Sequence, residues 1–160
     1  MINKKNIFAD EWLGSSHGEK FQRGHIALTD MSPQMGLGCG AFRVQPGKRA
    51  FPKHAHLAND EAIYVIAGSG MLTLGAEECR LREGDFVSLP RGADSPHVFV
   101  NDSDEDLIYL CISTMNAPDV VHYPDSGKLG VLESRESWGS ESSVSGFYRT
   151  QKAGYYDGED

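Results

Sequence analysis

The sequence predicts an all-β, single-domain protein built as an antiparallel sandwich or barrel. Short apolar or alternating runs recur between Phe21 and Thr114, a pattern typical of half-buried strands. Turn signals such as Pro46-Gly47 and Gly68-Ser69-Gly70 separate the runs, and no helical pattern interrupts them. The 18 glycines in 160 residues favour tight turns over helices. Because helices between strands would indicate a parallel sheet, this order favours antiparallel pairing.

The composition argues against several classes of protein. With 39% hydrophobic and 24% charged residues, the chain has the composition of an ordinary soluble globular domain. A net charge of −8 without a cluster of Lys and Arg predicts no nucleic-acid partner. Neither a signal-peptide core nor a membrane-spanning run is found, so we expect a cytoplasmic protein with no membrane contact. Cys39, Cys79 and Cys111 are odd in number and far apart, which predicts reduced thiols.

The chain divides into four parts. Residues 1–19 are polar and predict an N-terminal arm or short helix, and residues 20–132 hold the predicted barrel. Residues 133–145 are rich in serine and predict a flexible linker. Residues 146–160 form an aromatic tail that we expect to dock on its own barrel or on a second subunit. The predicted strands are HIALT, LGCGAFRVQ, EAIYVIAG, MLTLG, CRL, DFVSLP, HVFVN and DLIYLCIST, with one or two more between Asn116 and Ser134.

Two short segments concentrate residues that bind metals. In an extended strand, residues i and i+2 share a face, so His54 and His56 present two imidazoles on one side, roughly 7 Å apart along the chain. Glu61 follows a polar turn and opens the next predicted strand, from which its carboxylate can return to the same ion. His97 adds a further imidazole just after a turn rich in Pro and Gly.

These segments resemble the two motifs of the cupin superfamily, G-x5-H-x-H-x3,4-E-x6-G and G-x5-P-x-G-x2-H-x3-N. The residues that match the first motif, with one extra residue before the first histidine, are Gly47, His54, His56, Glu61 and Gly68. Those that match the second, with four rather than two residues before the histidine, are Gly84, Pro90, Gly92, His97 and Asn101. The resemblance covers roughly residues 36–114, and the tail also resembles that of small bacterial single-domain cupins.

The resemblance implies a double-stranded β-helix, or jelly-roll, barrel that is usually a homodimer. It also implies one divalent metal ion inside the barrel, held by His54, His56, Glu61 and His97. Neutral imidazoles and a carboxylate suit iron, manganese, nickel, copper or zinc better than calcium or magnesium. Such a site has a net charge of +1, attracts anionic ligands and leaves up to two positions of an octahedral shell open. A vestigial or purely stabilising site remains the alternative.

Several polar residues near the predicted ligands leave two interpretations open. Asn101 lies on the same strand face as His97 and either orients a ligand or closes a turn. Arg49, Lys53 and Arg91 flank the ligands, where solvated surface charge is favoured over contact with an anionic substrate.

The two-residue period of a strand predicts which neighbouring side chains face the ion and which face away from it. Ile63 and Val65 are in phase with Glu61 and are expected to line a cavity, whereas Tyr64 should face away from the metal. Tyr109 and Cys111 share one face of their strand, but the period does not tell whether that face is inside.

Two hypotheses of function follow. The first is a metal-dependent enzyme, of dioxygenase or isomerase type, acting on a small oxygen-bearing metabolite through bidentate binding to the ion. The second is a non-catalytic protein that binds or senses a sugar or organic acid and carries a structural metal. A second acid or base beside the ion would favour the enzyme, and an entirely apolar cavity around a saturated ion would favour the binder.

Overall fold

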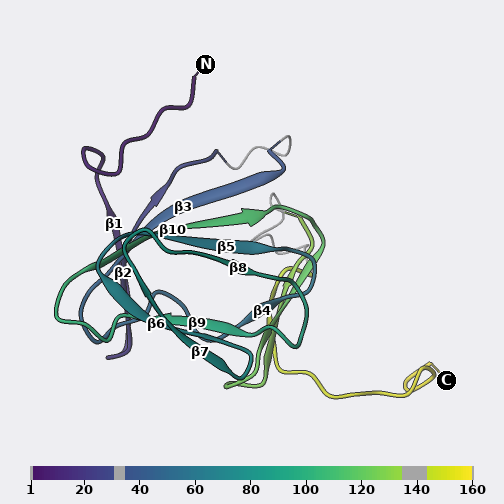
Figure 1. Ribbon diagram of the computed structural model, residues 1–160. Helices are drawn as coiled ribbons and strands as arrows, with labels where there is room; N and C mark the ends of the chain where they lie inside the picture. Colours follow the sequence, from purple (N-terminus) through teal and green to yellow (C-terminus); the bar gives the residue numbers. More distant parts are fainter. Residues whose placement is uncertain (1, 31–34, 135–143, 160) are drawn as a thin grey trace.

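The computed structural model describes residues 2–30, 35–134 and 144–159, and these residues fold as an all-β jelly roll (Figure 1). A six-stranded sheet has the order β1-β2-β3-β10-β5-β8. A three-stranded sheet, β7-β6-β9, and a four-stranded sheet, β13-β12-β11-β4, complete the fold. Every ladder between these strands is antiparallel, as the sequence predicts.

The predicted strand runs all form strands, with ends shifted by a few residues. The six-stranded sheet consists of β1 (Leu13–His17), β2 (Phe21–Ala27), β3 (Leu37–Val44), β10 (Leu107–Thr114), β5 (Glu61–Ala67) and β8 (Phe86–Leu89). The other two sheets consist of β4 (Ala55–His56), β6 (Ser69–Leu74), β7 (Glu77–Arg82), β9 (His97–Val100), β11 (Asp119–Tyr123), β12 (Lys128–Leu132) and β13 (Gly146–Tyr148). Strands β11 and β12 are the additional pair expected after Asn116.

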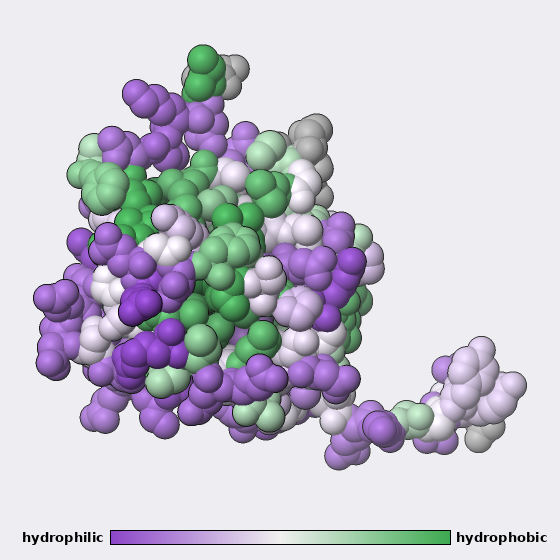
Figure 2. Space-filling view, in the orientation of Figure 1, coloured by the Kyte–Doolittle hydropathy of each residue, from purple (hydrophilic) through white to green (hydrophobic). Residues whose placement is uncertain are grey.

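The core lies between the sheets and is formed by inward-facing residues at alternate positions. Its members include Phe42 and Val44 of β3, Val65 of β5, Leu72 of β6 and Phe99 of β9. In a space-filling view, apolar side chains gather in the middle of the face shown, with hydrophilic ones around them (Figure 2). Burial of alternate residues from opposing sheets is what the period-two pattern of the sequence requires.

The turn after β5 depends on a glycine of the first motif. Gly68 has a φ of +78°, a conformation that L side chains rarely adopt. A side chain there would also collide with the backbone of Asp106 and Leu107. The chain can therefore pass from β5 directly into β6 only with glycine at this position.

The ends of the chain differ in their relation to the barrel. Within the predicted arm, residues 13–17 form β1, an edge strand paired with β2, in place of the short helix that was one alternative. In the tail, residues 146–148 form β13 on β12, and the chain then leaves the body of the molecule (Figure 1). Most of the predicted serine-rich linker, residues 135–143, lies outside the described residues. The described part of the chain holds no helix of the length and hydropathy needed to cross a membrane.

Candidate metal centre

Three short strands carry the four predicted ligands to one place. His54 and His56 lie at β4, Glu61 begins β5, and His97 begins β9. The two motifs meet at their histidines: the amide of His54 donates to the carbonyl of His97 over 3.1 Å, and the amide of His97 donates back over 2.8 Å. The backbone therefore sets the distance between ligands that are far apart in the sequence.

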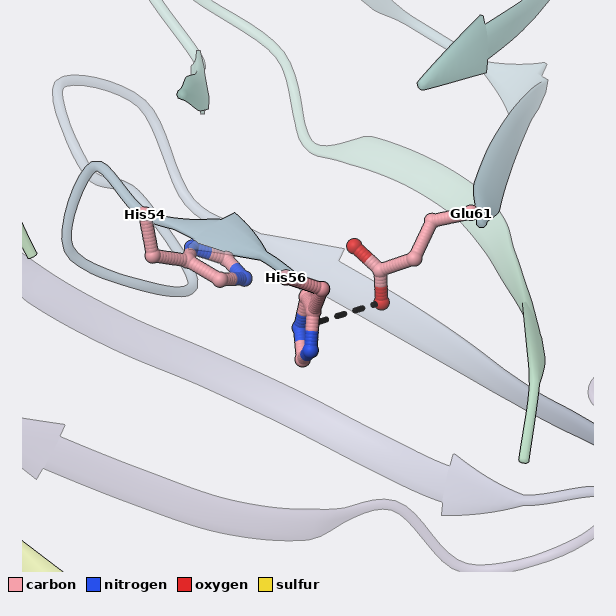
Figure 3. Close-up of side chains that lie close together, drawn as sticks. All are labelled: His54, His56 and Glu61. Carbon is pink, nitrogen blue, oxygen red and sulfur yellow. Dashed lines mark ion pairs between the residues drawn. The ribbon is translucent and has the colours of Figure 1, made fainter. Parts of the chain in front are cut away.

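The side chains of these residues converge. One ligand atom from each of His54, His56 and Glu61 lies within 4.8 Å of the others, and the three side chains point toward one another (Figure 3). Nε2 of His56 is 3.8 Å from Oε1 of Glu61. Nε2 of His97 is 3.0 Å from Oε2 of the same carboxylate, and its ring centroid is 4.6 Å from that of His54. The structure therefore brings all four predicted residues together.

The Nδ1 atom of each histidine faces an oxygen acceptor. Nδ1 of His54 lies 2.8 Å from the carbonyl oxygen of Pro52, and Nδ1 of His97 lies 3.4 Å from that of Ser95. Nδ1 of His56 lies 2.6 Å from a carboxylate oxygen of Asp119. Because these oxygens can only accept, Nδ1 of His54 and of His56 carries a proton, and in the neutral ring the Nε2 lone pair is left for the centre of the cluster.

The electrostatics of the cluster act in opposite directions on His54 and His56. Burial, and then the neighbouring His97, lower the pKa of His54 to about 4, so its ring is neutral at pH 7. Burial would raise the pKa of Glu61, but the hydrogen bond from His97 and the nearby imidazoles lower it overall. Burial opposes protonation of His56, yet its pKa is raised, since Asp119 and Glu61 both stabilise the imidazolium.

Asp119, which the sequence analysis did not identify, holds His56 in place. Its side chain is 1% exposed and accepts three hydrogen bonds, from His56, from the amide of Ala58 and from the side chain of Asn59. Burial alone would raise the pKa of Asp119, but these donors lower it. No motif signals this residue, because its place next to His56 arises only from the pairing of β11 with β4.

A cavity of about 360 Å³ opens beside the cluster. That volume falls at the lower end of the roughly 300–1,000 Å³ typical of small-molecule sites. Ile63 lines the cavity as predicted, whereas Val65 is fully buried in the core outside the lining. Tyr64 is 40% exposed on the opposite face, also as predicted.

The face shared by Tyr109 and Cys111 proves to be the inner one, since both residues line the cavity. The Cys111 thiol donates a hydrogen bond to Oε1 of Glu61 over 3.6 Å. Burial, followed by the charge of Glu61, raises the pKa of this thiol well above its usual range, so it stays protonated. Cys111 therefore has a place beside a predicted ligand, although the sequence suggested only a small buried residue.

Two aromatic residues that the sequence analysis missed also line the cavity. Tyr123 of β11 stacks on the ring of His54, with centroids 5.9 Å apart. His25 of β2 stacks on Phe42, with centroids 4.7 Å apart. Both lie outside the motifs, and only the pairing and packing of distant strands brings them to the site.

The structure resolves the interpretations left open for the polar neighbours. Asn101 is fully buried and closes a turn: its amide donates to the carbonyls of Val44 and Glu105. Lys53 donates to the carbonyl of Gly75, and Arg91 forms a hydrogen bond with Ala58 and an ion pair with Asp60. The guanidinium of Arg49 lies over the ring of Phe21. None of these four side chains lines the described cavity.

The donor set fits a divalent transition metal. Three imidazoles whose Nδ1 atoms face oxygen acceptors, with a carboxylate between them, match the nitrogen and oxygen ligands that such ions prefer. The contact between Nε2 of His97 and Glu61 requires a proton on that nitrogen, and metal binding would release it. The residues present are therefore chemically able to hold the ion that the motifs imply.

Comparison with known proteins agrees with the fold and the motifs. Residues 40–113 match the family described as Cupin domain. A crystal structure from Acidithiobacillus ferrooxidans, of a protein provisionally named a sugar phosphate isomerase, is 30% identical with a TM-score of 0.70. The match covers 78% of this chain and 81% of that one. This chain belongs to the cupin superfamily, in its small cupin-2-like group.

Two further relatives match, one over most of the chain and one over a shorter part. A sugar phosphate isomerase of the cupin superfamily from Silicibacter pomeroyi is 23% identical, with a TM-score of 0.72 over 93% of this chain and 92% of that one, and shows the shared fold. An uncharacterized protein from Methanocaldococcus jannaschii is 32% identical over 60 residues, which is 38% of this chain. The match spans 46%, or about half, of that curated relative.

Proposed function

We propose that the chain is a metal-dependent isomerase of small hydroxy-carbonyl compounds, with one divalent ion bound by His54, His56, Glu61 and His97. The observation that carries the proposal is the convergence of His54, His56 and His97 on the carboxylate of Glu61, with every Nδ1 facing an oxygen acceptor. Outer partners of this kind fix ring orientation and tautomer in metal sites. An ordinary cluster of buried histidines has no need of them.

The ion, when bound, would act as a Lewis acid that polarises the carbonyl group of a substrate. The name of the relative from Acidithiobacillus ferrooxidans supports interconversion of an aldose and a ketose as the type of reaction. Such a reaction moves one hydrogen between neighbouring carbon atoms and one proton between their oxygen atoms, and it needs no external oxidant. For that reason we favour it over the dioxygenase alternative.

The residues of the chain supply the environment for this reaction. Ile63, Leu89 and Phe99 form apolar walls of the cavity that exclude water and strengthen electrostatic interactions inside it. Tyr109 lines the same cavity, and burial raises the pKa of its hydroxyl well above the usual range, so it remains a hydrogen-bond donor. The thiol of Cys111 orients Glu61. Polar groups beside the cluster thus support an enzyme over a purely structural site.

Metal analysis tests the first half of the proposal. The purified full-length protein should contain about one equivalent of iron, manganese, nickel or zinc per chain, and chelation should lower its melting temperature. His56→Ala should lose the metal. His122→Ala is the matched control, because His122 lies next to Val121, the partner of His56, yet outside the cluster. Stoichiometric metal in His56→Ala would contradict the ligand assignment.

A substrate screen tests the second half. Metal-loaded protein would be incubated with aldoses and hydroxy-ketones in D2O, and exchange of the proton next to the carbonyl would be followed by NMR. Exchange in the wild type and its loss in His56→Ala are expected. Metal binding without exchange, combined with saturable binding of a sugar or organic acid, would support the non-catalytic binding protein instead. Oxygen uptake with the same compounds would support the dioxygenase.

A further inference from the structure

The imidazole of His25 lines the cavity but does not belong to the cluster of candidate metal ligands. Its ring stacks on Phe42 at an interplanar angle of 16°. Gly40 makes room for it, because a Cβ at position 40 would lie 2.9 Å from Nε2 of His25 and 3.2 Å from Phe42. Within the described residues, neither ring nitrogen has a hydrogen-bond partner, although the ring is half-buried. A half-buried imidazole in a cavity is thus left to bond with whatever fills it.

The register of the strands relates His25 to the metal cluster. Gly40, which underlies the ring of His25, is paired with Cys111 of β10. Cys111 in turn donates to Glu61. His25, Cys111 and the cluster therefore line the same cavity, and Cys111 connects the strand beneath His25 to Glu61. A small molecule bound at the cluster can extend past Cys111 toward His25.

The chemistry of this end of the cavity suits hydroxyl groups. Burial, and then the charge of Arg23, lower the pKa of His25, so the ring is neutral and offers one donor and one acceptor. The described lining nearby consists of Thr29, Cys39 and Ser113 with apolar side chains. A phosphate monoester carries about −1.5 to −2 charges and is typically bound by Arg or Lys. The guanidinium of Arg23, whose charge acts on His25, lies over the ring of Phe51, donates to the carbonyl of Ala50 and is outside the cavity lining. A neutral imidazole among hydroxyls and thiols is therefore better matched to a hydroxyl.

We infer that His25 is a substrate-binding residue that hydrogen-bonds the distal hydroxyl of a small, unphosphorylated polyhydroxy carbonyl compound. This inference rests on the proposed function, since it takes the carbonyl end of the substrate to bind at the metal cluster. It assigns a substrate class that differs from the one in the names of the sugar phosphate isomerases. It also explains why glycine is needed at position 40.

Hydroxamates of two lengths provide the test, because a hydroxamate chelates a divalent ion through two oxygens. Binding of glycolohydroxamate, erythronohydroxamate and 4-phosphoerythronohydroxamate to the full-length Mn²⁺-loaded protein would be measured by calorimetry. The wild type should bind erythronohydroxamate at least roughly tenfold more tightly than glycolohydroxamate, and the phosphorylated compound no more tightly than its parent. His25→Leu should remove this preference while leaving the affinity for glycolohydroxamate unchanged. His25→Gln, which keeps a donor and an acceptor, should retain part of it.

Two further variants make the result unambiguous. Gly40→Ala should displace the imidazole and also remove the preference, which provides a second route if His25→Leu does not fold. His17→Leu, at an exposed position of β1, should behave as the wild type. An unchanged preference in His25→Leu or Gly40→Ala, or much tighter binding of the phosphorylated compound, would overturn the inference about His25 alone. Failure of every hydroxamate to bind the metal-loaded wild type would instead overturn the proposed function and the inference with it.

Discussion

Nδ1 of His56 and Oδ2 of Asp119 lie 2.6 Å apart although 63 residues separate them in the chain. The hydrogen bond joins β4 to β11 at the edge of the candidate metal centre. Because Asp119 also binds Ala58 and Asn59, it fixes the turn between β4 and β5 together with the ring. Loss of this carboxylate should therefore lower both the affinity for a metal ion and the stability of the fold.

Asp119→Asn tests this role. An amide has only one oxygen, so it cannot accept from all three donors, and its NH2 group must face one of them. We expect the affinity for the metal to fall by roughly 10–100-fold, as for other outer partners of metal ligands, and the metal-free protein to melt earlier. A competitive titration with a metal-binding dye measures the first effect. Unchanged affinity would show that His56 is oriented without Asp119.

His97→Ala tests whether the second motif supplies a ligand. Removal of a direct ligand should cost more metal affinity than removal of Asp119, so the loss should exceed the roughly 100-fold upper range of an outer partner. Asn101→Ala serves as a comparison within the same motif, since Asn101 closes a turn through Val44 and Glu105. That variant should lose stability but retain stoichiometric metal. A His97→Ala protein that binds metal normally would leave only His54, His56 and Glu61 as ligands.

Acid should destabilise the metal-free protein through His54. Its pKa is about 4 in the folded chain and ordinarily 6.5, so between these values the unfolded chain binds more protons. The free energy of unfolding therefore falls as the pH drops from 6.5 to 4, by up to about 3 kcal/mol from this group. The lowered pKa of Glu61 acts in the same direction below pH 4.5. The raised pKa of His56 acts oppositely, since its contribution is lost as the pH rises through the folded value.

Melting temperatures of the chelated protein across this range check the prediction. His54→Gln should flatten the decline between pH 6.5 and 4, because glutamine does not titrate. His122→Gln should keep the decline of the wild type. Equal slopes in all three proteins would mean that the acid sensitivity arises elsewhere.

The glycines of the two motifs should differ in their tolerance to alanine. Gly68 and Gly84 both have left-handed φ values, +78° and +87°. A Cβ at Gly84 meets nothing within 4 Å, whereas one at Gly68 meets the backbone of Asp106 and Leu107. Gly84→Ala should therefore cost only the conformational term of about 1–2 kcal/mol, and Gly68→Ala should cost distinctly more. Urea unfolding measures both, and equal losses would contradict the role of crowding.

We also predict that the chain is a homodimer and that its tail contributes to the contact between subunits. Tyr155 and Tyr156 are 89% and 77% exposed in the single chain, where the tail leaves the body of the molecule (Figure 1). Truncation after Tyr148 should then weaken dimerisation without changing metal content. Analytical ultracentrifugation of both forms checks this, and a monomeric full-length protein would refute it.

The fold was predictable because its signals are local. Alternation of apolar and polar residues between turn glycines marks strands such as β5, β6 and β10, and each lies within a few residues of its expected place. The four candidate ligands could be named for the same reason, since two compact motifs contain them. Tyr64 and Ile63 show that the period of two also sorted outward from inward side chains.

The rest of the site depends on contacts between strands that are distant in the sequence. His25 and Asp119 reach the cavity region through the pairings of β2 with β3 and of β11 with β4. The sequence places an imidazole and a carboxylate on these strands but does not specify which neighbours they meet. The period of two also has a limit. Val65 is in phase with Glu61, as the period predicts, yet it lies too deep in the core to line the cavity.

The double hydrogen bond between the backbones of His54 and His97 has a consequence for how this site tolerates change. Both motifs carry extra residues in the turns that precede these histidines, yet the two rings still meet. Since the spacing of the rings is set across the strands, insertions or deletions in the turns before Lys53 and before Pro96 alter the rim of the cavity and leave its centre in place. Those turns are accordingly the positions at which this scaffold can be lengthened or redesigned to admit new substrates.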